Sequence, residues 1–129
     1  MQIILREKQK VEVQFRGFSI MTDQPLLAGG DGSAPSPFDY FLASIGACAG
    51  FYVKSFCEQR GLSAEGIRLE QVMHRDPVKR MISKIEINIF LPEGFPEKYR
   101  DPVIKAAEAC SVKKHIASAP EFSVNTINA

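Results

Sequence analysis

Apolar and polar residues alternate at the start of the chain. Residues 11–15 read Val-Glu-Val-Gln-Phe, and the alternation resumes at residues 18–20 as Phe-Ser-Ile. A period of two is typical of a strand with one buried face. The interruption at Arg16 and Gly17 therefore predicts a hairpin whose turn lies at these two residues.

A loop and a long apolar helix are expected next. Residues 27–37 hold three glycines and two prolines, so this segment is predicted to be irregular. Ser36 suits the N-cap of a helix and Pro37 its first position. We expect the helix to run to about Arg60, with Gly61 as the residue that ends it.

The second half of the chain repeats this scheme with shorter helices. Alternation returns on both sides of a turn at residues 75–78, which predicts a second hairpin. The elements expected are strands at 67–73 and 85–91, helices at 102–110 and 111–118, and a closing strand at 122–127. The order ββ-α-ββ-α-α-β favours an α+β class, and the length fits one domain over residues 1–129.

Charge and composition narrow the range of partners. The chain has 16 Lys and Arg against 15 Asp and Glu, a net charge of +1, which gives no electrostatic footprint for nucleic acid or an anionic membrane. The longest uncharged run, residues 40–53, is shorter than the about 20 residues of a membrane span. Residues 1–10 lack the apolar stretch of a signal peptide, so a cytoplasmic location is expected.

Three cysteines and two histidines are too scattered for a zinc site, and no bound metal or cofactor is expected. Cys57 follows Cys48 by nine residues, and steps of about 100° place the two on opposite sides of a helix. Cys110 is then the remaining candidate partner for Cys48. From local sequence alone, Cys48 and Cys110 each fit a buried small apolar residue as well as a reactive thiol, whereas Cys57 is expected to be structural.

The stretch GGDGSAPSPFDYFLASIGACAGFYVKSFCEQRGL, residues 29–62, followed by AAEACSVKKHI resembles the OsmC/Ohr family of osmotically inducible and organic hydroperoxide resistance proteins. The similarity extends over essentially the whole chain. It implies the OsmC-like fold, in which curved antiparallel sheets wrap two long central helices of an intertwined homodimer. This agrees with the predicted order of elements.

The resemblance also implies a thiol-dependent peroxidase that reduces small organic hydroperoxides in oxidative stress defence. The two reactive cysteines of the family fall on Cys48, as the attacking thiolate, and on Cys110, as the resolving thiol. A Cys48–Cys110 disulfide would form, and an external dithiol, such as a lipoyl-type reductant, would reduce it. No cofactor would be bound.

Activation of the thiolate calls for a nearby cation. The organic hydroperoxide enzymes use an arginine seven residues before an aspartate, a spacing that Arg16 and Asp23 reproduce, although Arg16 also fits an exposed turn residue. Phe38 occupies the position of the glutamate that orients this arginine in the family, and Asp39 follows it at an acidic position common in OsmC-like proteins. Ser111 stands where many relatives have proline after the second cysteine.

Apolar residues near Cys48 are candidates for a substrate pocket, although each of them is expected to be a core residue first. They are Phe38, Phe41, Phe51 and Tyr52. The missing glutamate at Phe38 motivates an alternative function: a non-enzymatic dimeric redox-sensing or binding module with the same fold and little turnover. A structural dimer with buried cysteines is a third interpretation.

Overall fold

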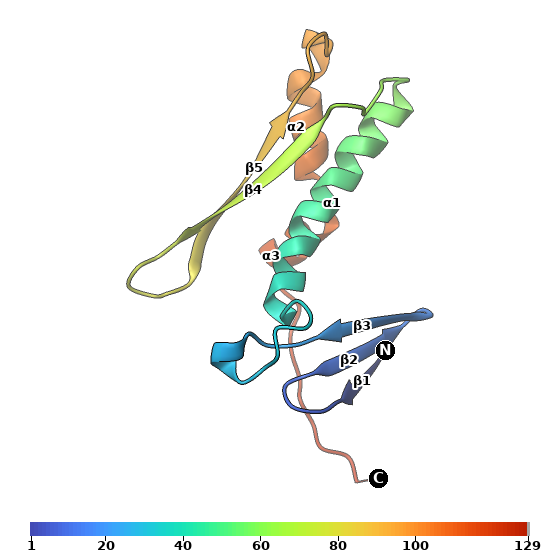
Figure 1. Ribbon diagram of the computed structural model, residues 1–129. Coiled ribbons are helices and arrows are strands. Elements are labelled where there is room, and N and C mark those ends of the chain that lie inside the picture. The colour runs from blue at the N-terminus through green and yellow to red at the C-terminus, as the bar shows by residue number, and fades with distance from the viewer. Residues whose placement is uncertain (129) are drawn as a thin grey trace. The chain divides into compact units, whose positions relative to one another are not determined.

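Three antiparallel strands form the N-terminal sheet (Figure 1). They are β1 (Gln2–Leu5), β2 (Val11–Phe15) and β3 (Phe18–Thr22), in the order β1-β2-β3. The predicted hairpin is confirmed, because Phe15 pairs with Phe18 across Arg16 and Gly17. Both turn residues have positive φ, 49° and 81°, as tight hairpin turns require. β1 lacks the alternating pattern. It forms a strand because its backbone pairs with the edge of β2.

The computed structural model describes residues 1–128, which divide into two compact units, Met1–Ser44 and from Ile45 onward. Since the chain divides in this way, one domain over residues 1–129 stays a prediction.

The loop after β3 is organised around Asp23, which is fully buried. Its carboxylate accepts hydrogen bonds from the Ser33 N–H and hydroxyl and from the N–H groups of Gln24 and Asp31, at 2.7 to 3.1 Å. These hydrogen bonds hold the pKa of Asp23 well below its ordinary value, and the bonds from Ser33 have the largest effect. A Cβ at Gly30 would lie 1.9 Å from the Gln24 carbonyl oxygen, so the loop closes only around a glycine.

The long helix α1 (Pro37–Gln59) starts and ends as predicted. Ser36 and Asp39 cap its start reciprocally: the Ser36 N–H and hydroxyl donate to the Asp39 carboxylate at 2.8 and 2.7 Å, and the Asp39 N–H donates to the Ser36 hydroxyl at 3.2 Å. Gly61, with a φ of 64°, ends the helix. α1 is long and apolar enough to cross a membrane. The core helix of a soluble protein meets the same criterion of length and composition.

The second unit contains the hairpin of β4 (Arg68–Arg75) and β5 (Ile82–Phe90), which confirms the second predicted hairpin (Figure 1). Leu69 pairs with Ile89, and Gln71 pairs with Ile87. The apolar members of these pairs are partly buried and pack against the core, so one face of the hairpin is covered.

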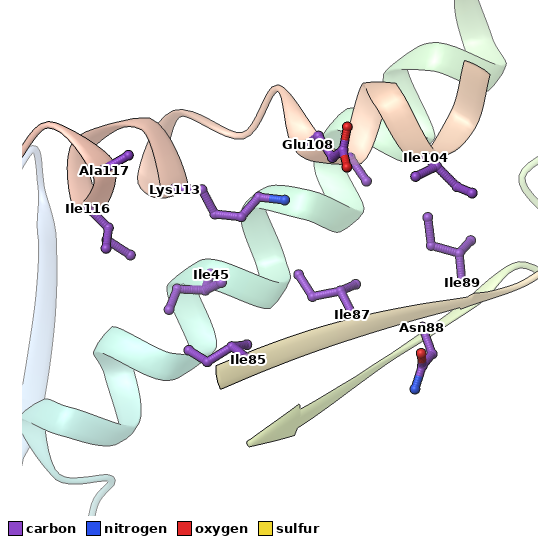
Figure 2. A pocket seen from close by; sticks show the side chains of 11 residues that line it. Ile45, Ile85, Ile87, Asn88, Ile89, Ile104, Glu108, Lys113, Ile116 and Ala117 are labelled. Carbon is purple, nitrogen blue, oxygen red and sulfur yellow. The ribbon is translucent and has the colours of Figure 1, made fainter. Parts of the chain in front are cut away.

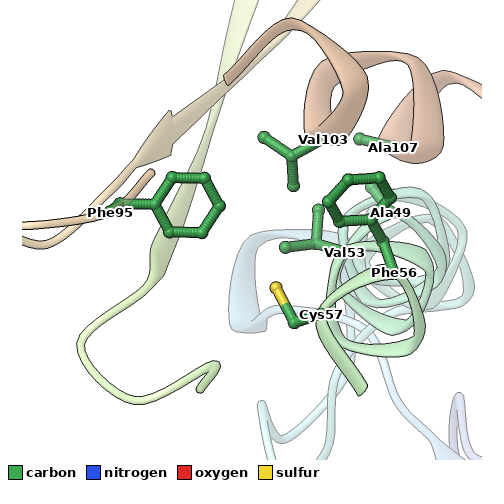
Figure 3. Packing of buried hydrophobic residues seen from close by; sticks show 7 residues of the cluster. All are labelled: Ala49, Val53, Phe56, Cys57, Phe95, Val103 and Ala107. Atoms are coloured by element: carbon green, nitrogen blue, oxygen red, sulfur yellow. The ribbon is translucent and has the colours of Figure 1, made fainter. Parts of the chain in front are cut away.

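The core of the second unit lies between α1 and α2 (Arg100–Glu108). Figure 3 shows Val103 and Ala107 of α2 pointing toward α1. The buried residues are Ala49, Val53, Phe56, Cys57, Phe95, Val103 and Ala107. The last helix, α3 (Ser111–Ala117), follows a break at Ala109 and Cys110.

Several expected boundaries differ from the structure: β4 ends at Arg75 rather than 73, β5 begins at Ile82 rather than 85, and α2 ends at Glu108 rather than 110. α2 begins at Arg100 rather than Pro102, because a 3-10 turn, η2 (Glu97–Tyr99), leads directly into it. The closing strand predicted at residues 122–127 is wrong, since the structure assigns no strand there. Phe122, Val124 and Ile127 of this segment are exposed, and within residues 1–128 no strand pairs with it. The α+β class and the antiparallel pairing are confirmed.

Candidate functional site

The second unit brings Cys48 and Cys110 together. Cys48 lies on α1, directly before the fully buried Ala49, and is itself partly exposed. Cys110 lies between α2 and α3 and is fully buried. Both are free thiols, and Cys110 is near enough to Cys48 to lower the pKa of the Cys48 thiol. The site therefore contains a dithiol pair with one accessible and one buried member.

Backbone N–H groups complete the surroundings of the Cys48 sulfur. Those of Val112 and Ser111, in the first turn of α3, act as donors toward it. The first N–H groups of a helix have no acceptor within the helix and are available to outside partners. Cys110 precedes this turn with a non-helical backbone, φ −51° and ψ 124°, so α2 and α3 are separate helices rather than one.

The Cys48 thiol is easier to ionise than an ordinary cysteine. Burial raises its pKa, but the hydrogen bonds from the Cys110 thiol and from the N–H groups of Val112 and Ser111, together with the charge of Lys113, more than compensate. The pKa of Cys48 is therefore lowered from its usual value. Because the thiolate is the nucleophilic form, this environment favours reaction at Cys48.

A cavity of about 640 Å³ lies between α1, β5, α2 and α3. Its lining is mainly isoleucine with a few polar side chains (Figure 2): Ile45, Ile85, Ile87, Asn88, Ile89, Ile104, Ala107, Glu108, Lys113, Ile116 and Ala117. Ile45 lies one turn before Cys48 on α1, and Figure 2 shows the Lys113 side chain extending from α3 toward α1. The cavity is thus an apolar space that shares Lys113 with the thiol site.

Residues 30–125 of the chain match the family model described as OsmC-like protein. The chain belongs to the OsmC family. The matched range includes the positions of Cys48 and Cys110, and the match confirms the resemblance to the OsmC family. No curated protein matches the chain.

Solved structures confirm the OsmC fold. A protein from Psychrobacter arcticus described as an osmotic stress induced and detoxification response protein is 20% identical, with a TM-score of 0.72 over 88% of this chain and 84% of that chain. An OsmC-like protein from Mycoplasma pneumoniae is 13% identical, with a TM-score of 0.71 over 92% and 86%. An organic hydroperoxide resistance protein OsmC from Legionella pneumophila is 19% identical, with a TM-score of 0.53 over 90% and 89%.

Two further residues that the family resemblance suggests for the site, Arg16 and Asp39, belong to the first unit. The Arg16 guanidinium lies over the ring of Phe15, 4.8 Å from its centroid, in the turn of the first hairpin. The Asp39 carboxylate caps α1 through Ser36, and these hydrogen bonds lower its pKa. Roles of Arg16 and Asp39 toward Cys48 stay predictions.

The four candidate pocket aromatics form two ring pairs. Phe38 and Phe41 stack with centroids 5.5 Å apart, and Phe51 and Tyr52 meet edge to face at 5.5 Å. None of the four lines the isoleucine cavity within the described part of the chain. The Tyr52 hydroxyl instead forms a hydrogen bond with the Ser111 hydroxyl, with 3.0 Å between the two oxygens.

Cys57 lies in the core, as the helical spacing predicts. It is fully buried among residues of α1 and α2, and burial raises its pKa. A buried thiol that is difficult to ionise is a poor nucleophile. Cys57 is therefore a packing residue in this structure.

Sequence reasoning missed Lys113 as a partner of Cys48. In the structure Ser111, Val112 and Lys113, which directly follow Cys110 in the chain, act on Cys48. The only sequence signal is the position of Lys113 in the first turn of a helix that follows a cysteine. Which thiol faces that turn depends on how α3 packs against α1.

Replacing Lys113 by methionine should raise the pKa of Cys48, because a favourable charge is lost while the apolar stem is kept. At pH 7 we expect alkylation of Cys48 by iodoacetamide to slow by roughly twofold to fivefold. Lys114→Met, which removes a neighbouring exposed lysine, is the matched control and should leave the rate unchanged. Equal rates for Lys113→Met and the wild type across the pH titration would show that Lys113 does not act on Cys48.

Proposed function

We propose that this OsmC family member is a thiol-dependent peroxidase that reduces small organic hydroperoxides in oxidative stress defence. The observation that carries the proposal is that Cys110 lies near enough to Cys48 to lower the pKa of the Cys48 thiol. The Legionella pneumophila structure with the same fold, described as an organic hydroperoxide resistance protein and a predicted redox protein, is in line with this chemistry.

In the first step the Cys48 thiolate attacks the terminal oxygen of the hydroperoxide. A sulfur–oxygen bond forms and the O–O bond breaks, so that the alkoxide leaves and takes up a proton to become the alcohol. Sulfur is oxidised by two electrons to a sulfenic acid. The N–H groups of Ser111 and Val112 and the charge of Lys113 support this step, because they favour the thiolate.

In the second step the Cys110 sulfur attacks the Cys48 sulfenic acid. The disulfide forms, and the hydroxide that leaves combines with the proton of the Cys110 thiol to give water. The nearness of the two thiols supports this role for Cys110. An external dithiol, of lipoyl or similar type, returns the pair to the reduced form by thiol–disulfide exchange, with no bound cofactor.

A homodimer and a cytoplasmic location belong to the same proposal. Phe51 on α1 is 64% exposed, and a side chain at Gly50 would meet nothing within 4 Å. This uncovered side of α1 supports packing against a second copy of the chain. Three free thiols fit a reducing compartment.

Treating the reduced protein with one equivalent of cumene hydroperoxide should join Cys48 to Cys110 and leave Cys57 free. The reason is that Cys110 is already next to Cys48, whereas Cys57 lies in the core. Peptide mapping by mass spectrometry after alkylation of free thiols checks this result. A disulfide through Cys57, or three free thiols after the peroxide is consumed, would contradict the proposal.

A further inference from the structure

Ser111 occupies the point where α1, Cys110 and α3 meet. It directly follows Cys110 and is the first residue of α3. Its hydroxyl lies 3.0 Å from the hydroxyl of Tyr52, which is one turn after Cys48 on α1. This hydrogen bond connects residues 59 positions apart and ties the start of α3 to the helix that carries the attacking thiol.

We propose that Ser111 and Tyr52 are a pair of positioning residues that hold Cys110 and the first turn of α3 against Cys48. The inference deepens the proposed peroxidase function. The catalytic role of the pair rests on that function. Ser111 has two separable parts in this arrangement. Its hydroxyl holds α1, and its backbone N–H faces the Cys48 sulfur.

The Tyr52 side chain is suited to this task. The ring of Phe51 meets it edge to face at 5.5 Å, which limits the positions of the Tyr52 ring. The Tyr52 hydroxyl therefore presents a defined partner to Ser111. Since α3 has only seven residues and no buried side chain, a specific hydrogen bond at its first residue has a large share in fixing where it starts.

The backbone N–H of Ser111 can be tested apart from its hydroxyl. As the first residue of the helix, Ser111 needs no N–H for the helix itself, and proline is favoured at this position. The backbone of Cys110, with φ −51° and ψ 124°, also suits a residue that precedes proline. Ser111→Pro therefore removes the N–H and the hydroxyl while the helix start is kept.

Loosening this tie should affect disulfide formation more than ionisation of Cys48. Condensation needs the Cys110 sulfur aligned with the Cys48 sulfur, so it depends on the position of the α2–α3 junction. Ionisation of Cys48 depends on the N–H donors as well. Loss of a hydroxyl and loss of the N–H should therefore differ in their effects on the rate of disulfide formation and on the ionisation of Cys48.

The experiment measures two quantities for each variant. The first is the rate of intramolecular Cys48–Cys110 disulfide formation driven by diamide, a thiol oxidant that needs no peroxidase activity. The second is the pH midpoint of Cys48 alkylation. The variants are Ser111→Ala, Tyr52→Phe, their double mutant, Ser111→Thr and Ser111→Pro. Tyr40→Phe, which removes a tyrosine hydroxyl bonded to the Met21 carbonyl in the first unit, is the control.

We expect Ser111→Ala and Tyr52→Phe each to slow disulfide formation by roughly threefold to tenfold. The double mutant should be no slower than either single variant, because both remove the same hydrogen bond. Ser111→Thr, which keeps a hydroxyl, should restore the rate. Ser111→Pro should move the alkylation midpoint of Cys48 furthest to higher pH, because among these variants only it lacks the N–H.

Wild-type rates in both single variants, or effects that add in the double mutant, would overturn the positioning pair. An unchanged alkylation midpoint in Ser111→Pro would overturn the part assigned to the N–H. These outcomes are independent of the peroxidase proposal, which fails separately if cumene hydroperoxide does not oxidise the wild-type protein. The diamide and alkylation measurements still decide the positioning role in that case.

Discussion

Cys48→Ser should abolish the reduction of cumene hydroperoxide, with a rate on the order of 100-fold or more below that of the wild type. The physical reason is that a serine hydroxyl in this site stays protonated, whereas the hydrogen bonds and charge around Cys48 stabilise a thiolate. Because the chain contains no tryptophan, the rate is followed by the loss of peroxide in rapidly quenched samples rather than by protein fluorescence.

The matched control for this experiment is Cys57→Ala. It removes a thiol from the same helix, at a fully buried position, and should keep peroxide reduction near the wild-type rate. Circular dichroism of both variants verifies that α1 is intact. Equal and negligible rates in the wild type and in Cys48→Ser would contradict the peroxidase proposal and favour the non-enzymatic redox-sensing or binding module.

Cys110→Ser should allow the first oxidation and stop the cycle there. The serine hydroxyl can still donate a hydrogen bond toward Cys48, so the thiolate keeps most of its stabilisation, but no sulfur is available to form the disulfide. We expect a sulfenic acid on Cys48 to accumulate, and turnover supported by a dithiol to fall by at least about tenfold. Excess peroxide should convert the sulfenic acid to sulfinic acid.

Trapping with dimedone followed by mass spectrometry measures the sulfenic acid. The wild type treated in the same way should show little trapped product, because Cys110 competes for the same sulfur. Turnover of Cys110→Ser at the wild-type rate would mean that another thiol resolves the sulfenic acid. A disulfide between Cys48 residues of two chains in this variant would identify that thiol as one from a partner.

Local patterns in the sequence are sufficient for most of the secondary structure. The hairpin turn at Arg16 and Gly17 and the capping of α1 by Ser36 depend on neighbouring residues, so each can be predicted from a few positions. β1 and the segment 122–127 cannot be predicted in this way. Whether an extended segment becomes a strand depends on a hydrogen-bonding neighbour, and that neighbour is distant in sequence.

In the candidate site, too, some features follow from local sequence and others from tertiary packing. The spacing of Cys48 and Cys57 along one helix is a matter of helical geometry, and it suffices to place the two thiols on different sides of α1. The contact between Cys48 and Cys110 is expected from the family resemblance, and the structure provides it through the packing of α2 on α1. Arg16 is the cation that the resemblance implies, and its role stays a prediction.

Sequence periodicity, capping residues and the family resemblance are thus enough to specify the α+β class, the long helix α1 and the two cysteines to consider. The surroundings of the thiolate depend on tertiary packing. Ser111, Val112 and Lys113 follow Cys110 in the chain, yet they face Cys48 because the start of α3 lies against α1. Hydrogen bonds and charge act through distance in space, which local sequence does not encode.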